Sequence, residues 1–140
     1  MRIIFVADVF VEDGILGGGE LNNDEFINLV SKQNIVVEKI SSTAVTPEYI
    51  QDNLDARFLI ANFIALTEEC KSVLVDKARY AIYEHDHKYL VTRNPSGYEG
   101  FVAPESHLIN IEFYKNALAI YCQSKLHAEI VQKNLKTDNV

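Results

Sequence analysis

The sequence predicts an α/β domain with a Rossmann-like, three-layer architecture and a parallel sheet of five strands. Five short apolar runs are each too short to form a buried helix, and segments with helical spacing of apolar residues separate them. Neighbouring parallel strands need crossover connections of about a dozen residues, which the helical segments supply. The right-handed crossover rule leaves few arrangements, and we expect the strand order 3-2-1-4-5.

The expected strands are apolar and rich in β-branched or aromatic residues. The first, Arg2 to Asp8, is a continuous apolar run that ends in a carboxylate, which is typical of a central strand buried on both faces. The others are Ile35 to Ile40, Arg57 to Phe63, Tyr80 to Glu84 and Ala117 to Cys122.

Helix-start signals separate these strands. The segment Thr46-Pro47-Glu48 combines a capping hydroxyl, a proline at the first helical position and an acid in the first turn. The expected helices begin at or next to Glu20, Thr46, Thr67, Leu108 and Ser124. Between His85 and Glu105 the apolar residues show neither the helical nor the strand spacing, which predicts a loop. A loop of this length is usually functional.

Length and charge limit the possible classes of protein. The 140 residues predict one domain that spans residues 1–140. The net charge of -7, with only 13 scattered Lys and Arg residues, argues against a nucleic-acid surface. No apolar run approaches the ~20 residues that a membrane span requires. We therefore expect a cytoplasmic protein without a transmembrane segment.

Two unusual stretches follow the first and fourth strands. A glycine-rich stretch from Gly17 to Glu20 comes after the first, and Glu84-His85-Asp86-His87 ends the fourth. In open α/β sheets, ligands bind beyond the carboxyl ends of the strands where the strand order reverses, which the expected order places between these two strands. We therefore expect both stretches to contribute to one ligand site.

Gly17, Gly18 and Gly19 lead, with Glu20, into the first helix. Unhindered backbone amides and the positive end of a helix suit a phosphate or a sugar hydroxyl. The stretch is not a P-loop, because Gly-Lys-Ser/Thr is missing, and Asn22 stands where a dinucleotide fingerprint needs its last glycine. A turn in which the glycines only satisfy backbone geometry is the alternative.

His85, Asp86 and His87 bring acid and base groups to the edge of the sheet, where they suit ligand binding or proton transfer. A metal site is an alternative, but zinc or iron would need a third ligand, and neither His107 nor His127 has a diagnostic spacing. A capped structural turn is another. We expect no cofactor and assign no metal ligand.

Three further residues are candidates for substrate binding. Lys88 and Arg93, just beyond the histidines, suit an anion. Ser124 is expected to cap the last helix, and a cap at the carboxyl end of a strand also points into the crevice of the sheet.

These motifs make the chain similar to the amino-terminal domain of GT-B type glycosyltransferases, of the family 4-like or group 1 kind. The matching features are the first strand I-I-F-V-A-D, the Gly-Gly-Gly-Glu start of the first helix and the His85-Asp86 pair. The segment Ala117 to Leu135 resembles the fifth strand of that family, its serine and the helix that follows. The resemblance covers nearly the whole chain and rests on the order and spacing of the motifs.

The resemblance implies hexosyl-type transfer from a nucleotide-sugar donor to a glycan or small-molecule acceptor. In that family two Rossmann-like domains face a cleft, and the first mainly holds the acceptor. Gly18 and Gly19 would lie near the donor diphosphate or the transferred sugar, and His85 would face the reacting sugar, with Asp86 beside it. A C-terminal donor-binding domain is expected in addition, without which these 140 residues would be inactive.

Two other functions stay open. The first is a stand-alone α/β module that binds a nucleotide or another small anion without catalysis. The second is a metal-dependent hydrolase built on His85, Asp86 and His87.

Overall fold

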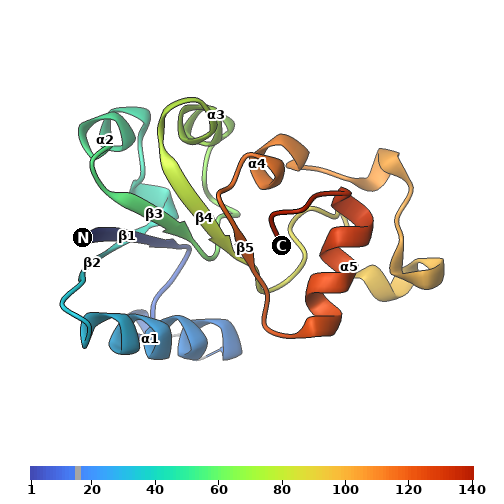
Figure 1. Cartoon of the computed structure of the whole chain (residues 1–140), viewed down its shortest axis with the longest axis horizontal. Helices are drawn as coiled ribbons and strands as arrows, with labels where there is room; N and C mark the ends of the chain where they lie inside the picture. The colour runs from blue at the N-terminus through green and yellow to red at the C-terminus, as the bar shows by residue number, and fades with distance from the viewer. Residues whose placement is uncertain (15–16) are drawn as a thin grey trace.

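A computed structural model describes residues 1–14 and 17–140, which form a five-stranded sheet with helices on both sides (Figure 1). Every strand pairing in the sheet is parallel, which confirms the expected α/β class. The strands are β1 (Arg2–Ala7), β2 (Val36–Ser41), β3 (Arg57–Ile60), β4 (Arg79–Tyr83) and β5 (Ile120–Tyr121). The helices are α1 (Gly18–Ser31), α2 (Pro47–Asp52), α3 (Glu68–Lys77), α4 (Ile111–Lys115) and α5 (Lys125–Leu135).

The strand order is β2-β1-β3-β4-β5, which differs from the expected 3-2-1-4-5 at one strand. β3 lies between β1 and β4 instead of beyond β2. Side-chain polarity explains this position: Phe58, Leu59 and Ile60 of β3 are buried, as an interior strand requires, whereas Glu38 and Lys39 of β2 are exposed. Charged residues are typical of edge strands, and β2 forms one edge of the sheet.

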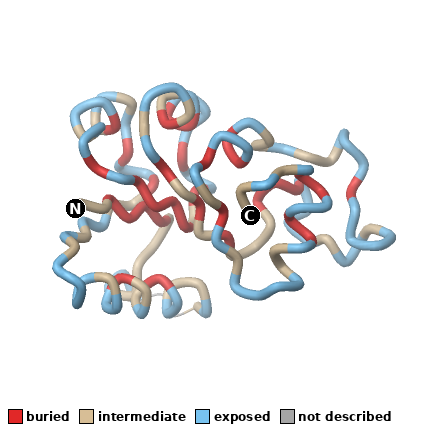
Figure 2. Tube along the Cα trace, in the orientation of Figure 1, coloured by how far each residue is buried: buried red, intermediate tan, exposed pale blue. Residues whose placement is uncertain are grey.

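Apolar side chains on the two faces of the sheet form two cores. Ile4 and Val6 of β1 belong to the larger core, with residues of α2, α3 and α4, whereas Phe5 and Ala7 belong to a smaller core with α1. Figure 1 shows α1 below the sheet and α2, α3 and α4 above it. Figure 2 shows the buried stretches gathered along the central strands.

The caps expected at Thr46, Thr67 and Ser124 are present. Each hydroxyl accepts a hydrogen bond from a backbone N–H in the first turn of its helix, at 3.1 to 3.2 Å. α1 begins at Gly18, two residues before the expected start, and Gly17 is its extended N-cap. Among the described helices, none has the length and apolar character needed to span a bilayer.

The segment that follows β4 folds against the rest of the domain at its start and end. Tyr89 and Leu90 are fully buried, and an isolated antiparallel bridge joins Leu90 to Leu108. His87 and Arg93, which flank this buried stretch, have left-handed backbone φ angles of 54° and 53°. The long loop predicted between His85 and Glu105 is thus fixed beside the carboxyl ends of the strands.

Candidate functional site

The candidate site lies where the strand order turns, at the carboxyl ends of β1, β3 and β4. The connection from β1 leads to α1 on one face, and the connection from β3 leads to α3 on the other (Figure 1). The loop after β3 therefore joins the site, which the expected order had placed between the first and fourth strands only. Asn62 is the residue of this loop that matters most.

Gly19 lies beside His85, so the glycine stretch and the histidine cluster meet as expected. A Cβ atom on Gly19 would lie 3.9 Å from Cγ and Nδ1 of the His85 ring and 3.8 Å from Nδ2 of Asn62. The first turn of α1 and the end of β4 thus form the two walls of one site.

Two side-chain amides hold the His85 ring. Nε2 of His85 lies 2.8 Å from Oδ1 of Asn23, and the side-chain amide of Gln123 donates to Nδ1. An oxygen partner on one nitrogen and an N–H donor on the other match the neutral imidazole with its proton on Nε2. Burial, helped by the nearby Lys88 ammonium, lowers the pKa of His85 below its ordinary value of 6.5.

Asn23 is the positioning residue that the sequence analysis missed. It lies one turn after Gly19 on the same side of α1 and is 1% exposed. Its Nδ2 atom has no hydrogen-bond partner among the described residues. A polar residue four positions after a glycine at a helix start was the available signal, although this spacing is common in surface helices.

The other members of the glycine stretch have different surroundings. A Cβ atom on Gly17 would overlap the carboxylate of Glu20, which folds back toward the start of α1. Gly18 is exposed, and a Cβ atom there would have no described heavy atom within 4 Å. Gly18 therefore adds no side chain to the first turn of α1.

Glu84 is fully buried and anchors the turn after β4. Its carboxylate accepts hydrogen bonds from the Tyr114 hydroxyl and, at 3.0 Å, from the backbone N–H of Asp86. Burial, together with the adjacent Glu84, raises the pKa of Tyr114. Glu84 thus fixes the backbone from which His85 and Asp86 project.

Asp86 accepts hydrogen bonds from two cations. The Lys88 ammonium donates to one carboxylate oxygen and also to Oδ1 of Asn62 at 3.0 Å, and Nη1 of Arg93 lies 3.3 Å from the other carboxylate oxygen. Lys88 is only 3% exposed. The geometry therefore makes Asp86 the group that orients Lys88 and Arg93.

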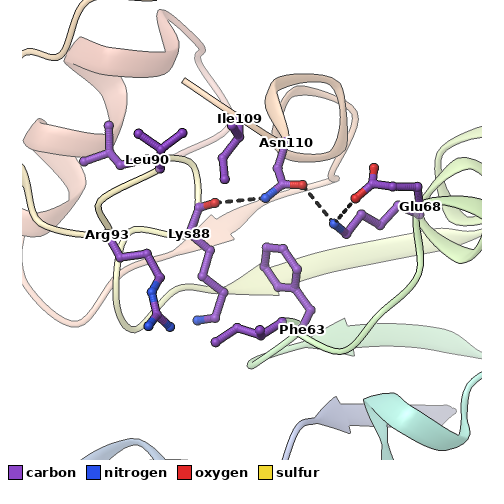
Figure 3. Close-up of a pocket in the computed structure, with 10 residues that line it drawn as sticks. Phe63, Glu68, Lys88, Leu90, Arg93, Ile109 and Asn110 are labelled. Atoms are coloured by element: carbon purple, nitrogen blue, oxygen red, sulfur yellow. Dashed lines mark hydrogen bonds and ion pairs between the residues drawn. The ribbon is translucent and has the colours of Figure 1, made fainter. Parts of the chain in front are cut away.

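Lys88 and Arg93 line a pocket of about 540 Å³, which we call the lysine pocket (Figure 3). The Phe63 ring lies beside two ammonium groups, with Nζ of Lys71 and of Lys88 at 5.7 and 5.5 Å from its centroid. Nζ of Lys71 donates to Oε1 of Glu68 at 2.6 Å and to Oδ1 of Asn110 at 2.9 Å. Lys88 and Arg93 of this pocket were predicted to suit an anion, whereas Lys71 was not predicted, because it lies in an ordinary amphipathic helix.

His87 and Ser124 make other contacts. Nδ1 of His87 lies 2.7 Å from the Tyr89 hydroxyl, and the centroid of its ring lies 4.3 Å from that of His127. The Ser124 hydroxyl accepts from the backbone N–H of His127 at 3.1 Å. Neither residue contacts His85 in the described hydrogen-bond network, so Ser124 acts as a helix cap.

The described residues contain no group of three or more His, Cys, Asp or Glu side chains placed to hold a metal ion. His85 and His87 have different hydrogen-bond partners and do not converge. This geometry does not favour the hydrolase alternative.

Comparisons of the chain with models of known protein families, with curated proteins and with solved structures found no match.

Proposed function

We propose that this domain is the acceptor-side half of a glycosyltransferase that moves a sugar from a nucleotide-sugar donor to an acceptor hydroxyl. One observation carries the proposal: Gly19, at the start of α1, lies next to the neutral ring of His85. A Cβ atom built on Gly19 would lie 3.9 Å from that ring, which has a hydrogen-bond partner on each of its two nitrogens. The resemblance likewise implies that Gly19 lies near the donor diphosphate or the transferred sugar and that His85 faces the reacting sugar.

Sugar transfer requires that the diphosphate is bound and that the acceptor hydroxyl is aligned, and each wall of the site suits one of these tasks. The first-turn backbone N–H groups and the positive end of α1, a helix of 14 residues, suit the diphosphate or a sugar hydroxyl. His85 faces Gln123, which is exposed, so a substrate hydroxyl can replace the Gln123 amide at Nδ1. Asn23 keeps the ring in place during this exchange.

The proposed role of His85 is to align a reacting hydroxyl. Positioning and electrostatic stabilisation usually supply most of the lowering of such a barrier. Asp86, which we expected to act directly, orients Lys88 and Arg93 in this proposal. The groups that stabilise the leaving diphosphate belong mostly to the expected donor-binding domain.

The proposal is tested in a polypeptide that joins this chain to a donor-binding domain. His85→Ala should lower the turnover number for sugar transfer by roughly 10² to 10³, the range for one well-placed polar or acid–base group. The matched control is His107→Ala, because His107 bonds to Tyr98 away from the site. Full activity of folded His85→Ala, checked by circular dichroism, would contradict the proposal.

The lysine pocket favours a second candidate, a stand-alone module that binds a small anion without catalysis. Its cations lie in a preformed cavity that needs no second domain. Saturable anion binding by these residues, with no sugar transfer by any polypeptide that contains them, would favour this candidate over the first.

A further inference from the structure

The lysine pocket concentrates positive charge in an acidic protein. Three of its lining residues are cations, Lys71, Lys88 and Arg93, against the single carboxylate of Glu68. The whole chain shows the opposite balance, with 20 acidic and 13 basic residues. Lys71 and Lys88 are also 9% and 3% exposed, although lysine is rarely this deeply buried unless it is paired.

The positive charge is not spread evenly in the pocket. At one end, Lys71 is neutralised by Glu68, so this ion pair has no net charge. At the other end, Lys88 and Arg93 share the carboxylate of Asp86, so these three side chains together carry one positive charge in excess. An anion is therefore attracted to the end of the pocket where Lys88 and Arg93 lie.

The backbone at this end is held in a conformation that non-glycine residues rarely adopt. Arg93 has a left-handed φ angle of 53°, and His87, before Lys88, has a φ angle of 54°. Such angles persist only where the surrounding structure enforces them, and they cluster at binding sites. Here they position two cations on the same carboxylate.

We propose that the lysine pocket binds a phosphoryl group carried by the acceptor, at its Lys88 and Arg93 end. A guanidinium and an ammonium are the side chains that phosphate recognition uses most. Leu90, Val91 and Ile109 line the same pocket and offer an apolar wall to the organic part of the ligand. The volume of about 540 Å³ falls within the range of sites for small organic molecules.

The pocket is connected to the proposed reaction site through Asn62. Its Oδ1 accepts from Lys88, and its Nδ2 lies 3.8 Å from the Cβ position of Gly19. The pocket and the proposed reaction site thus lie on either side of one side chain, Asn62. Binding of a phosphoryl group in the pocket is independent of the proposed function, whereas the ligand's role as the acceptor rests on it.

The test is direct binding to the 140-residue chain and its variants, measured by calorimetry and by amide chemical shifts. The probes are sn-glycerol 3-phosphate, glycerol, acetate, and phosphatidylcholine vesicles with and without phosphatidic acid. We expect saturable binding of glycerol 3-phosphate or of the phosphatidic acid vesicles, and none of glycerol. The first result would indicate a free phosphorylated acceptor, and the second a lipid-linked one.

Three variants locate the bound phosphoryl group. Arg93→Gln should weaken binding by about tenfold or more, as expected for a lost charge-assisted hydrogen bond. Lys71→Gln, at the neutralised end, should weaken it by less than about threefold. Arg57→Gln removes the same charge from the amino end of β3, at the opposite end of the strands from the pocket, and should have no effect. Arg93 is used because its side chain is half exposed, so the variant should fold.

Several results would overturn the inference. These are no saturable binding of either phosphoryl probe, equal binding of acetate, or equal effects of Arg93→Gln and Arg57→Gln. Failure of the proposed function looks different, because the phosphoryl probe would then bind as expected while no sugar transfer occurs. Transfer that needs His85 but does not distinguish neutral from phosphorylated acceptors would overturn this inference alone.

Discussion

Three histidines near the carboxyl end of β4 share one electrostatic property. Burial is the main cause that lowers the pKa of His85, His87 and His127 below the ordinary value of 6.5. His85 and His87 lie at the end of β4, and His127 lies in the first turn of α5 against the His87 ring. At neutral pH all three rings are therefore uncharged, which suits the hydrogen bonds that hold His85.

These lowered pKa values predict that the domain loses stability in mild acid. Near pH 6 the folded chain binds fewer protons than the unfolded chain, so the free energy of unfolding falls as the pH drops through 6.5. The loss levels off below the folded pKa values. Urea unfolding at about pH 7.5 and about pH 5.5, on either side of the ordinary histidine pKa, measures this difference.

A histidine variant provides the control for this pH dependence. His127→Gln should make the decrease between the two pH values smaller, because one titrating group is lost. Equal or higher stability of the parent chain at the lower pH would contradict the assignment of neutral rings.

At the scale of residues, the sequence predicted the unusual groups of the site and missed the ordinary ones. His85 and the glycines were predictable because runs of ionisable residues or glycines are rare at strand ends. Asn23, Asn62 and Gln123 were not predictable, since amides occur throughout exposed helices and loops. Their role depends on three elements that meet only in the folded chain.

At the scale of elements, side-chain patterns predicted where the strands lie in the sequence but not how they are ordered in the sheet. Apolar runs located all five strands to within a few residues, and hydroxyl caps located the starts of three helices. Neighbours in the sheet were harder to predict, because right-handed crossovers permit several orders. The charged residues Glu38 and Lys39 were the signal for the correct order. They make the second strand more suitable for the edge of the sheet than the apolar third strand.

This difference between an interior and an edge strand predicts the effects of two matched substitutions. Val6→Asp should lower the free energy of unfolding by about 3–5 kcal/mol, because it places an unpaired charge in a core strand. Val6 is fully buried, whereas Val36 of β2 is 60% exposed. Val36→Asp should therefore change stability by no more than about 0.5 kcal/mol.

Chemical denaturation of the parent chain and the two variants measures both values. A melting temperature of Val6→Asp within about two degrees of the parent would contradict the position of β1 as an interior strand of the sheet.

For the whole molecule, the proposed function makes a prediction about the parts needed for catalysis. The 140-residue chain alone should show no measurable sugar transfer, because the groups that stabilise the leaving diphosphate are expected in the donor-binding domain. Transfer is measured with the isolated chain and with a polypeptide that joins it to a donor-binding domain, at equal concentration of folded protein. Robust transfer by the isolated chain would contradict a two-domain mechanism.

Asn62 has one more consequence, because a single amide contacts both parts of the site. Its oxygen accepts a hydrogen bond from Lys88, and its nitrogen would lie 3.8 Å from a Cβ atom built on Gly19. A ligand that draws the Lys88 ammonium away changes the hydrogen bonding of this amide, and hence the surroundings of the glycine. Thermodynamic linkage makes such coupling reciprocal, so each substrate would alter the affinity for the other by the same factor. The Asn62 side chain alone would then make the binding of the two substrates cooperative.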